Sequence, residues 1–272
     1  MSETNDPTLW RAGLPWPGPD AHKHQRGRLG VVSGAMLQTG AARLAARAGL
    51  RVGAGLVRIL CPSDAGPVIA GAVEAVMVSA FDSPEALAGL AGSLDGVVIG
   101  PAAGLTEATA ANLAALAGTQ AALVVDADAL TLFKGRAEDL FALLDGRDVI
   151  TPHEGEFERL FPGLLAGGRE AAAVEAARRC GAQVVLKGRE TVIAAPDGRV
   201  RINRNGSPWL ATAGSGDVLA GLVGGLIVQK MDAFEAASAA VWMHADAAGR
   251  FGPGLTAEDL PGLIPGVLRD LA

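Results

Sequence analysis

The stretch GVVIGPAAGLTEATAANLAALAGTQAALVVD, residues 96–126, decides the fold. Two short apolar runs, at residues 96–99 and 122–126, have the composition of strands, and the alanine-rich segment at residues 107–117 is long enough for a helix. A helix is the usual connection between two parallel neighbours of a sheet. This segment therefore predicts one strand–helix–strand unit of an α/β protein.

The same alternation extends in both directions, from Arg28 to the end of the chain, and is typical of a mostly parallel central sheet with helices on both faces. Further strands are predicted at residues 29–33, 56–60, 75–79, 148–151, 183–187, 191–195 and 200–203. Further helices are predicted at residues 40–52, 83–91, 137–144, 155–160, 169–180, 217–229, 233–250 and 257–271. The turn Pro196-Asp197-Gly198 predicts that the last two strands form an antiparallel hairpin at one edge.

Composition limits the classes of protein that fit. The chain has 272 residues, of which 50% are hydrophobic and 19% charged, so it can bury a large core. No long linker divides it, and we predict a poorly packed arm at residues 1–21 followed by a single domain at residues 22–272. The formal net charge is −6, and the absence of a basic run argues against a nucleic-acid partner.

No membrane or export segment is expected. The longest dense apolar run, residues 218–228, is well short of the ~20 residues that a bilayer requires, and residues 1–20 lack the pattern of a signal peptide. Cys61 and Cys180 are far apart and lie in apolar stretches, as buried thiols of a reducing compartment do. We therefore expect a cytoplasmic protein.

The segment TAGSGD, residues 212–217, is a glycine-rich turn that opens an apolar helix. Backbone N–H groups of Gly214, Ser215 and Gly216, together with the helix dipole, would form an anion hole for a phosphoryl group. Asp217 would repel that group unless it takes a proton from an attacking hydroxyl, which favours a general base; the alternative is a helix cap. The segment matches neither a Walker A loop nor a Rossmann fingerprint.

Other strand ends also carry polar groups. Lys187 with its neighbouring glycine could hold a nucleotide, or could belong to a solvated hairpin. His153 lies in a strand-to-helix loop, where it could contact a ligand, and Glu156 in the following turn could simply complement the helix dipole. Asp126 and Asp128 could hold Mg²⁺ or a ribose, although Asp128 could equally cap the next helix.

Several segments, taken in order, resemble one family. They are KHQRGRLGVVSG from residue 23, GAARLAARAGLRVGAGLV from residue 40, VVDADAL from residue 124, ITPHEGEFERL from residue 150, LKGRET from residue 186 and ATAGSGDVLAG from residue 211. This set, spanning about residues 22–249, resembles the ADP-dependent NAD(P)H-hydrate dehydratases of the ribokinase-like superfamily. We expect no counterpart of the epimerase domain that is fused to some relatives.

The resemblance implies a ribokinase-like fold and a repair reaction. ADP would phosphorylate the ring hydroxyl of (6S)-NADH hydrate or (6S)-NADPH hydrate, and elimination would then return NAD(P)H with AMP and phosphate. It also implies Mg²⁺, whose ligands the residues do not identify, and a homotetramer. By resemblance the substrate lies near Ala41, Gly104, His153 and Asp217. The nucleotide lies on Lys187, Gly188, Arg189, Glu190, Thr191 and Gly216.

The sequence departs from the family pattern at three positions. Ala102 replaces the middle glycine of a GPGLG motif, Glu154 replaces a usual proline, and Ser215 replaces a usual threonine. Glu154 adds a negative charge where a diphosphate-bearing substrate is expected. Two other functions fit the residues: a kinase of the same fold acting on a vitamin-precursor alcohol, and a non-catalytic nucleotide-binding subunit. Asp217 argues against the second, since a binder gains nothing from a carboxylate beside phosphate.

Overall fold

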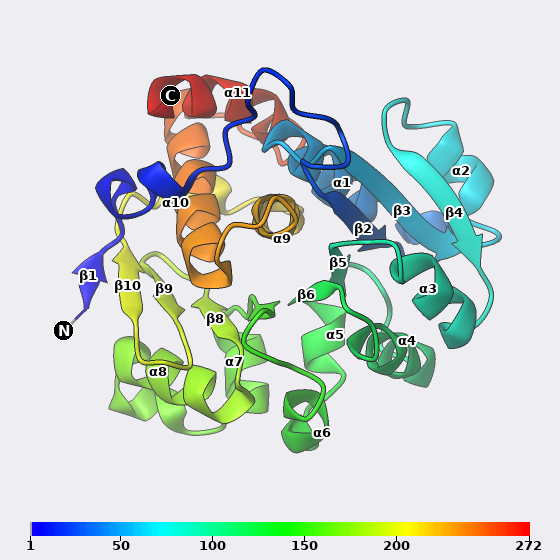
Figure 1. The fold of residues 1–272 in the computed structure, drawn as a ribbon. Helices are drawn as coiled ribbons and strands as arrows, with labels where there is room; N and C mark the ends of the chain where they lie inside the picture. The colour runs from blue at the N-terminus through cyan, green and yellow to red at the C-terminus, as the bar shows by residue number, and fades with distance from the viewer. Residues whose placement is uncertain (1) are drawn as a thin grey trace.

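The computed structural model describes residues 2–272, in which ten strands form one sheet (Figure 1). Their order is β1-β10-β9-β8-β7-β6-β5-β2-β3-β4. The strand β9 is antiparallel to both neighbours, and the other neighbouring pairs are parallel. The strands are β1 Glu3–Thr4, β2 Arg28–Val32, β3 Leu56–Pro62, β4 Met77–Phe81, β5 Gly96–Ile99, β6 Ala122–Val125, β7 Val149–Ile150, β8 Gln183–Leu186, β9 Thr191–Ala194 and β10 Val200–Asn203.

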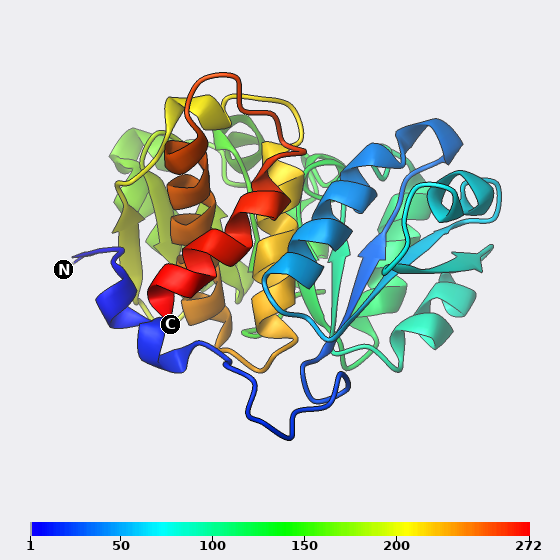
Figure 2. The ribbon, with the colours of Figure 1, turned by 90° about the horizontal axis from the view of Figure 1, so that it is seen from above.

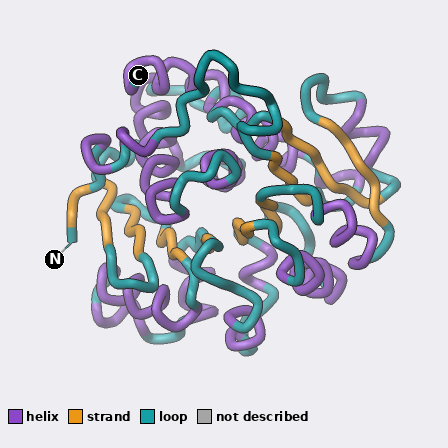
Figure 3. Tube along the Cα trace, viewed as in Figure 1, coloured by secondary structure: helices purple, strands orange, loops and turns teal. Residues whose placement is uncertain are grey.

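Helices cover both faces of the sheet, as the purple and orange segments of Figure 3 show. The α-helices are α1 Gly40–Arg51, α2 Gly66–Ala70, α3 Pro84–Ala91, α4 Glu107–Ala117, α5 Asp128–Thr131, α6 Ala137–Phe141, α7 Glu154–Leu160, α8 Arg169–Cys180, α9 Ser215–Ile227, α10 Ala233–Phe251 and α11 Leu260–Leu271. Short 3₁₀ helices are Pro7–Leu9, Arg11–Gly13, Met36–Gln38, Leu164–Gly167 and Pro208–Leu210.

The helices α1, α9, α10 and α11 lie on one face, and α3 to α8 lie on the other (Figures 1 and 2). Alternation along the strands supplies a core to each face. In β5, Val98 belongs to the cluster beneath α1 and α9, whereas Val97 and Ile99 belong to the cluster beneath α3 and α4. The predicted α/β class, with a mostly parallel sheet covered on both sides, is confirmed.

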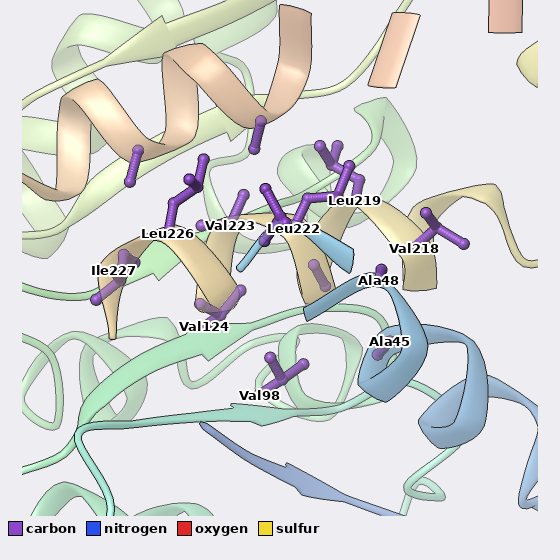
Figure 4. Packing of buried hydrophobic residues seen from close by; sticks show 14 of the residues in the cluster. Ala45, Ala48, Val98, Val124, Val218, Leu219, Leu222, Val223, Leu226 and Ile227 are labelled. Atoms are coloured by element: carbon purple, nitrogen blue, oxygen red, sulfur yellow. The ribbon is translucent and has the colours of Figure 1, made fainter. Parts of the chain in front are cut away.

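The helix α9 lies in the middle of its layer and is buried from Val218 to Ile227. Figure 4 shows α9 over the strand that carries Val98 and beside Ala45 and Ala48 of α1, with the side chains of its leucines directed toward α10. Close contact with α1 requires a small residue, because a Cβ added at Gly221 would lie 2.1 Å from the carbonyl oxygen of Ala45. This packing fixes where α9 begins, and therefore where its first turn meets the sheet.

The predicted strands and helices are all present, with some ends displaced by up to a few residues. Three short elements were not predicted: β1, α2 and α5. The predicted β9–β10 hairpin is antiparallel, but β10 is not the outermost strand, because β1 pairs with its outer side.

The prediction of a poorly packed N-terminal arm is wrong for the segment around β1. Trp10 is 2% exposed and meets Trp242 edge to face, with ring centroids 5.8 Å apart. The side-chain amide of Asn5 donates to Asn203 Oδ1 at 2.9 Å and to the carbonyl of Ser238 at 2.8 Å. The arm packs because its polar and aromatic groups find partners more than 190 residues away, which no local pattern indicates.

Candidate active site

An ion pair lies where the neighbouring strands β6, β7 and β8 end, at their carboxyl ends. Lys187 follows β8, and its Nζ lies 2.7 Å from Oδ1 of Asp126, which follows β6 and is 2% exposed at its side chain. Glu156, in the first turn of α7, places Oε2 3.9 Å from the same ammonium. A buried carboxylate needs such a partner, because removing an unpaired charge from water is costly.

The glycine-rich turn lies against this pair. Gly214 precedes α9 with φ of 88°, a conformation that favours glycine. A Cβ added at Gly216 would lie 3.6 Å from Lys187 Nζ and 3.8 Å from Asp126 Oδ2. Ser215 donates its hydroxyl to the carbonyl of Leu210 at 2.8 Å, which ties the turn to the preceding loop.

The first turn of α9 has the donors of an anion site. The N–H of Ser215, predicted as part of the anion hole, donates instead to the carbonyl of Thr212 at 3.4 Å. Within residues 2–272, no acceptor contacts the backbone N–H of Gly216 or of Asp217. The unpaired N–H groups of a helix N-terminus carry partial positive charge and bind anions. Here they lie beside an ammonium, so the turn can stabilise a phosphoryl group in transfer.

Asp217 is the third residue of α9 and makes no capping hydrogen bond, so the capping alternative is not what the structure shows. The pKa of its carboxyl is raised to about 6: burial is the largest cause, the charges of Asp126 and Asp128 act in the same direction, and Lys187 opposes them. A carboxylate with this pKa is ionised at neutral pH, and it is more basic than an exposed aspartate. Asp217 therefore has the position and basicity of a general base.

His153 caps α7, and Glu156 completes a capping box. The Nδ1 atom of His153 accepts from the N–H of Gly155 at 2.9 Å and from that of Glu156 at 3.2 Å. A neutral His153 ring therefore carries its proton on Nε2. A β-bridge joins His153 to Lys187, and the N–H of Lys187 donates to the carbonyl of Pro152 at 2.9 Å. The loop histidine is exposed, and it lies beside the lysine of the predicted nucleotide segment.

Asp128 does not cap α5, because it is the first residue of that helix and Ala127 occupies the cap. It accepts the N–H of Gly104 at 2.9 Å instead, and the carbonyl of Gly104 accepts from Thr109 Oγ1 at 2.8 Å. Both backbone groups of Gly104 thus have partners within the protein. In the same loop Ala102 adopts φ of 54°, so its backbone keeps the left-handed conformation that suits the glycine of relatives.

Two cavities open near these residues. The first, of about 690 Å³, lies between the loop after β8, the start of α9 and the second half of α10; it is lined by Lys187, Gly188, Arg189, Thr191, Ser215, Gly216 and His244, among others. The second, of about 490 Å³, lies between the loops that follow β2 and β5, and Gly104 lines it. The chain order of the strands reverses between β2 and β5, and such a switch point commonly forms a binding crevice.

The structure thus gathers most of the predicted residues at one edge. Gly216 and Asp217 lie beside the ion pair of Lys187 and Asp126. Ala41 lies, partly buried, at the start of α1. Gly104 belongs to the second cavity and connects to the first group through Asp128, whose charge raises the pKa of Asp217. Arg189 and Glu190 are exposed on the loop after β8.

One residue of the first cavity was not predicted. His244 lies on α10, is 6% exposed, and has no partner for Nε2 within residues 2–272. Burial lowers its pKa to about 4, so the ring is neutral at physiological pH. It sits in the second half of the alanine-rich helix α10, and a single buried histidine in such a helix gives no recognisable pattern.

No protein-only metal site fits this geometry. Within residues 2–272, no three His, Cys, Asp or Glu side chains are grouped closely enough to hold an ion. Asp126, the nearest candidate, is already paired with an ammonium.

Comparison with solved structures defines the class: the protein has the ribokinase-like fold. A ribokinase-like superfamily protein from Enterococcus faecalis superposes with a TM-score of 0.89 at 23% identity, covering 100% of this chain and 96% of that one. The chain belongs to the NAD(P)H-hydrate dehydratase family, whose model matches residues 29–261. The predicted family resemblance is confirmed.

Relatives in this family are of two kinds. The chain is 35% identical to an ADP-dependent (S)-NAD(P)H-hydrate dehydratase of Xanthomonas campestris, over 94% of this chain and 93% of that protein. It is 43% identical to a bifunctional NAD(P)H-hydrate repair enzyme of Gloeobacter violaceus, over 89% of this chain but 48% of the relative. The chain spans about half the length of the bifunctional relatives that it matches.

A solved structure within the family gives the same fold. It is the ADP/ATP-dependent NAD(P)H-hydrate dehydratase of Bacillus subtilis co-crystallised with ATP and Mg²⁺. It matches with a TM-score of 0.89 and 28% identity, covering 100% of this chain and 99% of that chain.

Proposed function

We propose that this protein dehydrates (6S)-NADH hydrate or (6S)-NADPH hydrate at the expense of ADP, yielding NAD(P)H, AMP and phosphate. One observation carries the proposal. The carboxylate of Asp217, with a pKa of about 6, lies at the N-terminus of α9 and does not cap that helix. The named activity of the Xanthomonas campestris relative supports the choice of reaction. A hydro-lyase built on a kinase fold needs both a base for the hydroxyl and a site for the phosphoryl group.

The nucleotide is assigned to the larger cavity. Lys187, Gly188, Arg189 and Thr191 line it on one side and Gly216 on the other, and Glu190 belongs to the same loop. The hydrated dinucleotide is assigned to the group formed by Ala41, Gly104, His153 and Asp217. In support, its second cavity lies at the β2–β5 switch point, and Asp128 connects it to the catalytic turn.

In the proposed mechanism, Asp217 takes the proton of the ring hydroxyl as its oxygen attacks the β-phosphorus of ADP. The bond between that phosphorus and the bridging oxygen breaks, and AMP leaves. The N–H groups of Gly216 and Asp217, with the Lys187 ammonium, stabilise the charge that develops on the phosphoryl oxygens. The lone pair of the ring nitrogen then expels phosphate, and loss of a proton from the neighbouring ring carbon restores the double bond.

Magnesium is proposed as a partner of the nucleotide. Mg²⁺ in phosphoryl-transfer sites is usually held by substrate phosphates, water and one or two carboxylates. That mode is compatible with a chain that offers no three-carboxylate cluster in residues 2–272. The Bacillus subtilis relative was crystallised with both ATP and Mg²⁺.

Location and assembly stay predictions. None of the helices in residues 2–272 is long and apolar enough to cross a membrane. We propose a cytoplasmic, homotetrameric enzyme with no nucleic-acid partner, with residues 22–272 as its catalytic domain. Light scattering of the purified protein measures the oligomeric state directly.

The test is recovery of reduced-nicotinamide absorbance from NADH hydrate with Mg²⁺ and either ADP or ATP. Recovery with ADP, lost in Asp217→Asn, supports both the reaction and the base. The matched control is Asp197→Asn, which should keep full activity. Asp197 lies in the β9–β10 turn, next to the amino end of β8 and therefore at the opposite end of the strands from the site. Recovery with ATP alone would replace the donor. If NADH does not recover and the protein instead forms a phosphate ester from an added alcohol, the assigned function would change from dehydratase to kinase.

A further inference from the structure

A single arginine lies inside the loop assigned to the nucleotide. Arg169, the first residue of α8, directs its Nη2 at three carbonyl oxygens: those of Leu186 at 3.1 Å, Lys187 at 3.0 Å and Glu190 at 3.2 Å. These oxygens come from both ends of the turn after β8. The loop therefore bends around the guanidinium, which lies within hydrogen-bonding distance of carbonyl oxygens from both of its ends.

The loop has room for this group only because of a glycine. A Cβ at Gly188 would lie 2.5 Å from Arg169 Nη2 and 2.9 Å from its Cζ, closer than atoms can approach without a shift. The carbonyl of Gly188 accepts the hydroxyl of Thr191 at 3.3 Å, which closes the turn on its other side. The glycine that was predicted as a nucleotide contact thus also accommodates the arginine.

The other end of the guanidinium reaches the loop that carries His153. Arg169 Nη1 pairs with Oε1 of Glu154, the first residue of α7. Glu154 is the departure from the family pattern whose charge was expected to face the substrate. In the structure that charge is matched by Arg169. The backbone bridge between His153 and Lys187 joins the same two segments, so a cation and a bridge hold them together.

We propose that Arg169 is a positioning residue of the nucleotide site, oriented by Glu154. Holding three carbonyl oxygens inward keeps the N–H groups and the Lys187 side chain of this loop directed at the cavity. Arginine suits the task because its planar fork presents donors in two directions, whereas a lysine presents one ammonium. The inference rests on the proposed function in one respect: it takes the loop after β8 as the place where ADP binds.

The test compares ADP affinity, measured by calorimetry without turnover, in four variants. Arg169→Gln should raise the Kd for ADP about tenfold, which corresponds to ~1.4 kcal/mol. Arg169→Lys keeps the positive charge but should raise the Kd to a similar extent. Glu154→Gln should raise it about twofold to threefold. The matched control is Arg178→Gln, on the same helix, which should leave the Kd unchanged because its guanidinium, among residues 2–272, pairs only with Glu175.

Kinetics separate positioning from general damage. Arg169→Gln should raise KM for ADP by the same factor as Kd, with kcat at saturating ADP within about twofold of the parent. An unchanged Kd for ADP in folded Arg169→Gln would overturn the proposal, as would a fall in kcat without a change in KM. If Arg169→Gln does not fold, Arg169→Lys tests the same contacts, because it keeps the positive charge and removes the planar fork that reaches the three carbonyl oxygens.

The outcomes also distinguish this proposal from the proposed function. A parent protein that binds ADP but dehydrates nothing would overturn the dehydratase assignment and leave the Kd comparison valid. A parent protein that does not bind ADP would overturn the positioning role together with the nucleotide site.

Discussion

Asp217 is ionised among other acids, and this gives it a distinct pH dependence. Its pKa of about 6 means that lowering the pH through 6 protonates the proposed base. We expect kcat/KM to fall about tenfold per unit below that pH, since only the ionised form accepts a proton. A pH–rate profile with ADP saturating measures this. A rate that stays constant down to pH 4.5 would remove Asp217 from the role of base.

Asp217→Asn should separate activity from stability. We expect kcat to fall by about 10²–10⁴-fold. Because the folded pKa of Asp217 lies above its unfolded value, this group favours the folded state below pH 4, and that contribution is lost as the pH rises through 6. The substitution should therefore stabilise the protein by about 1 kcal/mol at pH 7. The two-unit pKa difference permits ~3 kcal/mol, but the carboxylate is partly exposed and screened.

Urea unfolding of the parent and Asp217→Asn at pH 4 and pH 7 tests the sign. The pKa of Asp148 is also raised to about 6 by burial, but that group is present in both proteins and cancels in the difference. A variant less stable than the parent at pH 7 would contradict the assigned pKa shift.

Lys187 should be as important for stability as for binding. Lys187→Met leaves the carboxylate of Asp126 buried without a counter-charge, and we expect a loss of about 3 kcal/mol. The double variant Lys187→Met/Asp126→Asn should recover most of it. Lys230→Met is the matched control, because its ammonium, 2.8 Å from Asp95, is largely exposed and should cost under ~1 kcal/mol. Equal losses in the single and double variants would show that the pair does not determine stability.

Single residues of the site were predictable when their chemistry stood at a strand end. Asp217 and Lys187 fall in motifs, so a role for each could be proposed from the sequence before the structure showed that they lie close together. Arg169 and His244 could not be found in this way. Each lies within an alanine-rich helix and away from any strand end. Only the tertiary structure brings Arg169 to the loop after β8 and His244 to the cavity that this loop lines.

At the scale of elements, the site depends on how α9 begins. Gly214→Ala would place a Cβ 2.8 Å from Leu44 Cδ1 in a backbone conformation of φ 88°. We expect a loss of stability of about 1–2 kcal/mol from the backbone alone, together with weaker phosphate binding. Thermal unfolding and ADP calorimetry measure the two effects. Gly249→Ala, in α10 with no atom within 4 Å of its added Cβ, is the control and should not destabilise the protein.

The elements themselves were largely predictable, because buried parallel strands consist of β-branched runs and their helices are separated by glycine and polar residues. The short elements were not. The strand β1 has two residues and α5 has four, too few for a hydrophobic period to appear. The order of the strands in the sheet could not be predicted either. The alternation of strands and helices shows which elements exist, but not which strands pair with one another.

For the whole molecule, the arm before the sheet should contribute to global stability. Trp10→Ala removes a ring that is 2% exposed and packs against Trp242, and we expect a loss of about 3–5 kcal/mol. Trp16→Ala, whose parent ring is 48% exposed, should change stability by less than ~0.5 kcal/mol. Chemical denaturation compares them. Similar small effects for both would mean that the arm can detach without cost.

The pairing of β1 with β10 also bears on how the chain comes to be folded. Asn5 and Asn203 are 198 residues apart in sequence, so during synthesis the early segment must wait for the late one. Until then β10 has an unsatisfied outer edge, the kind of surface onto which another chain can add a strand. Between the synthesis of residue 203 and the docking of residues 3–5, a newly made copy of this protein therefore exposes a strand edge that favours aggregation.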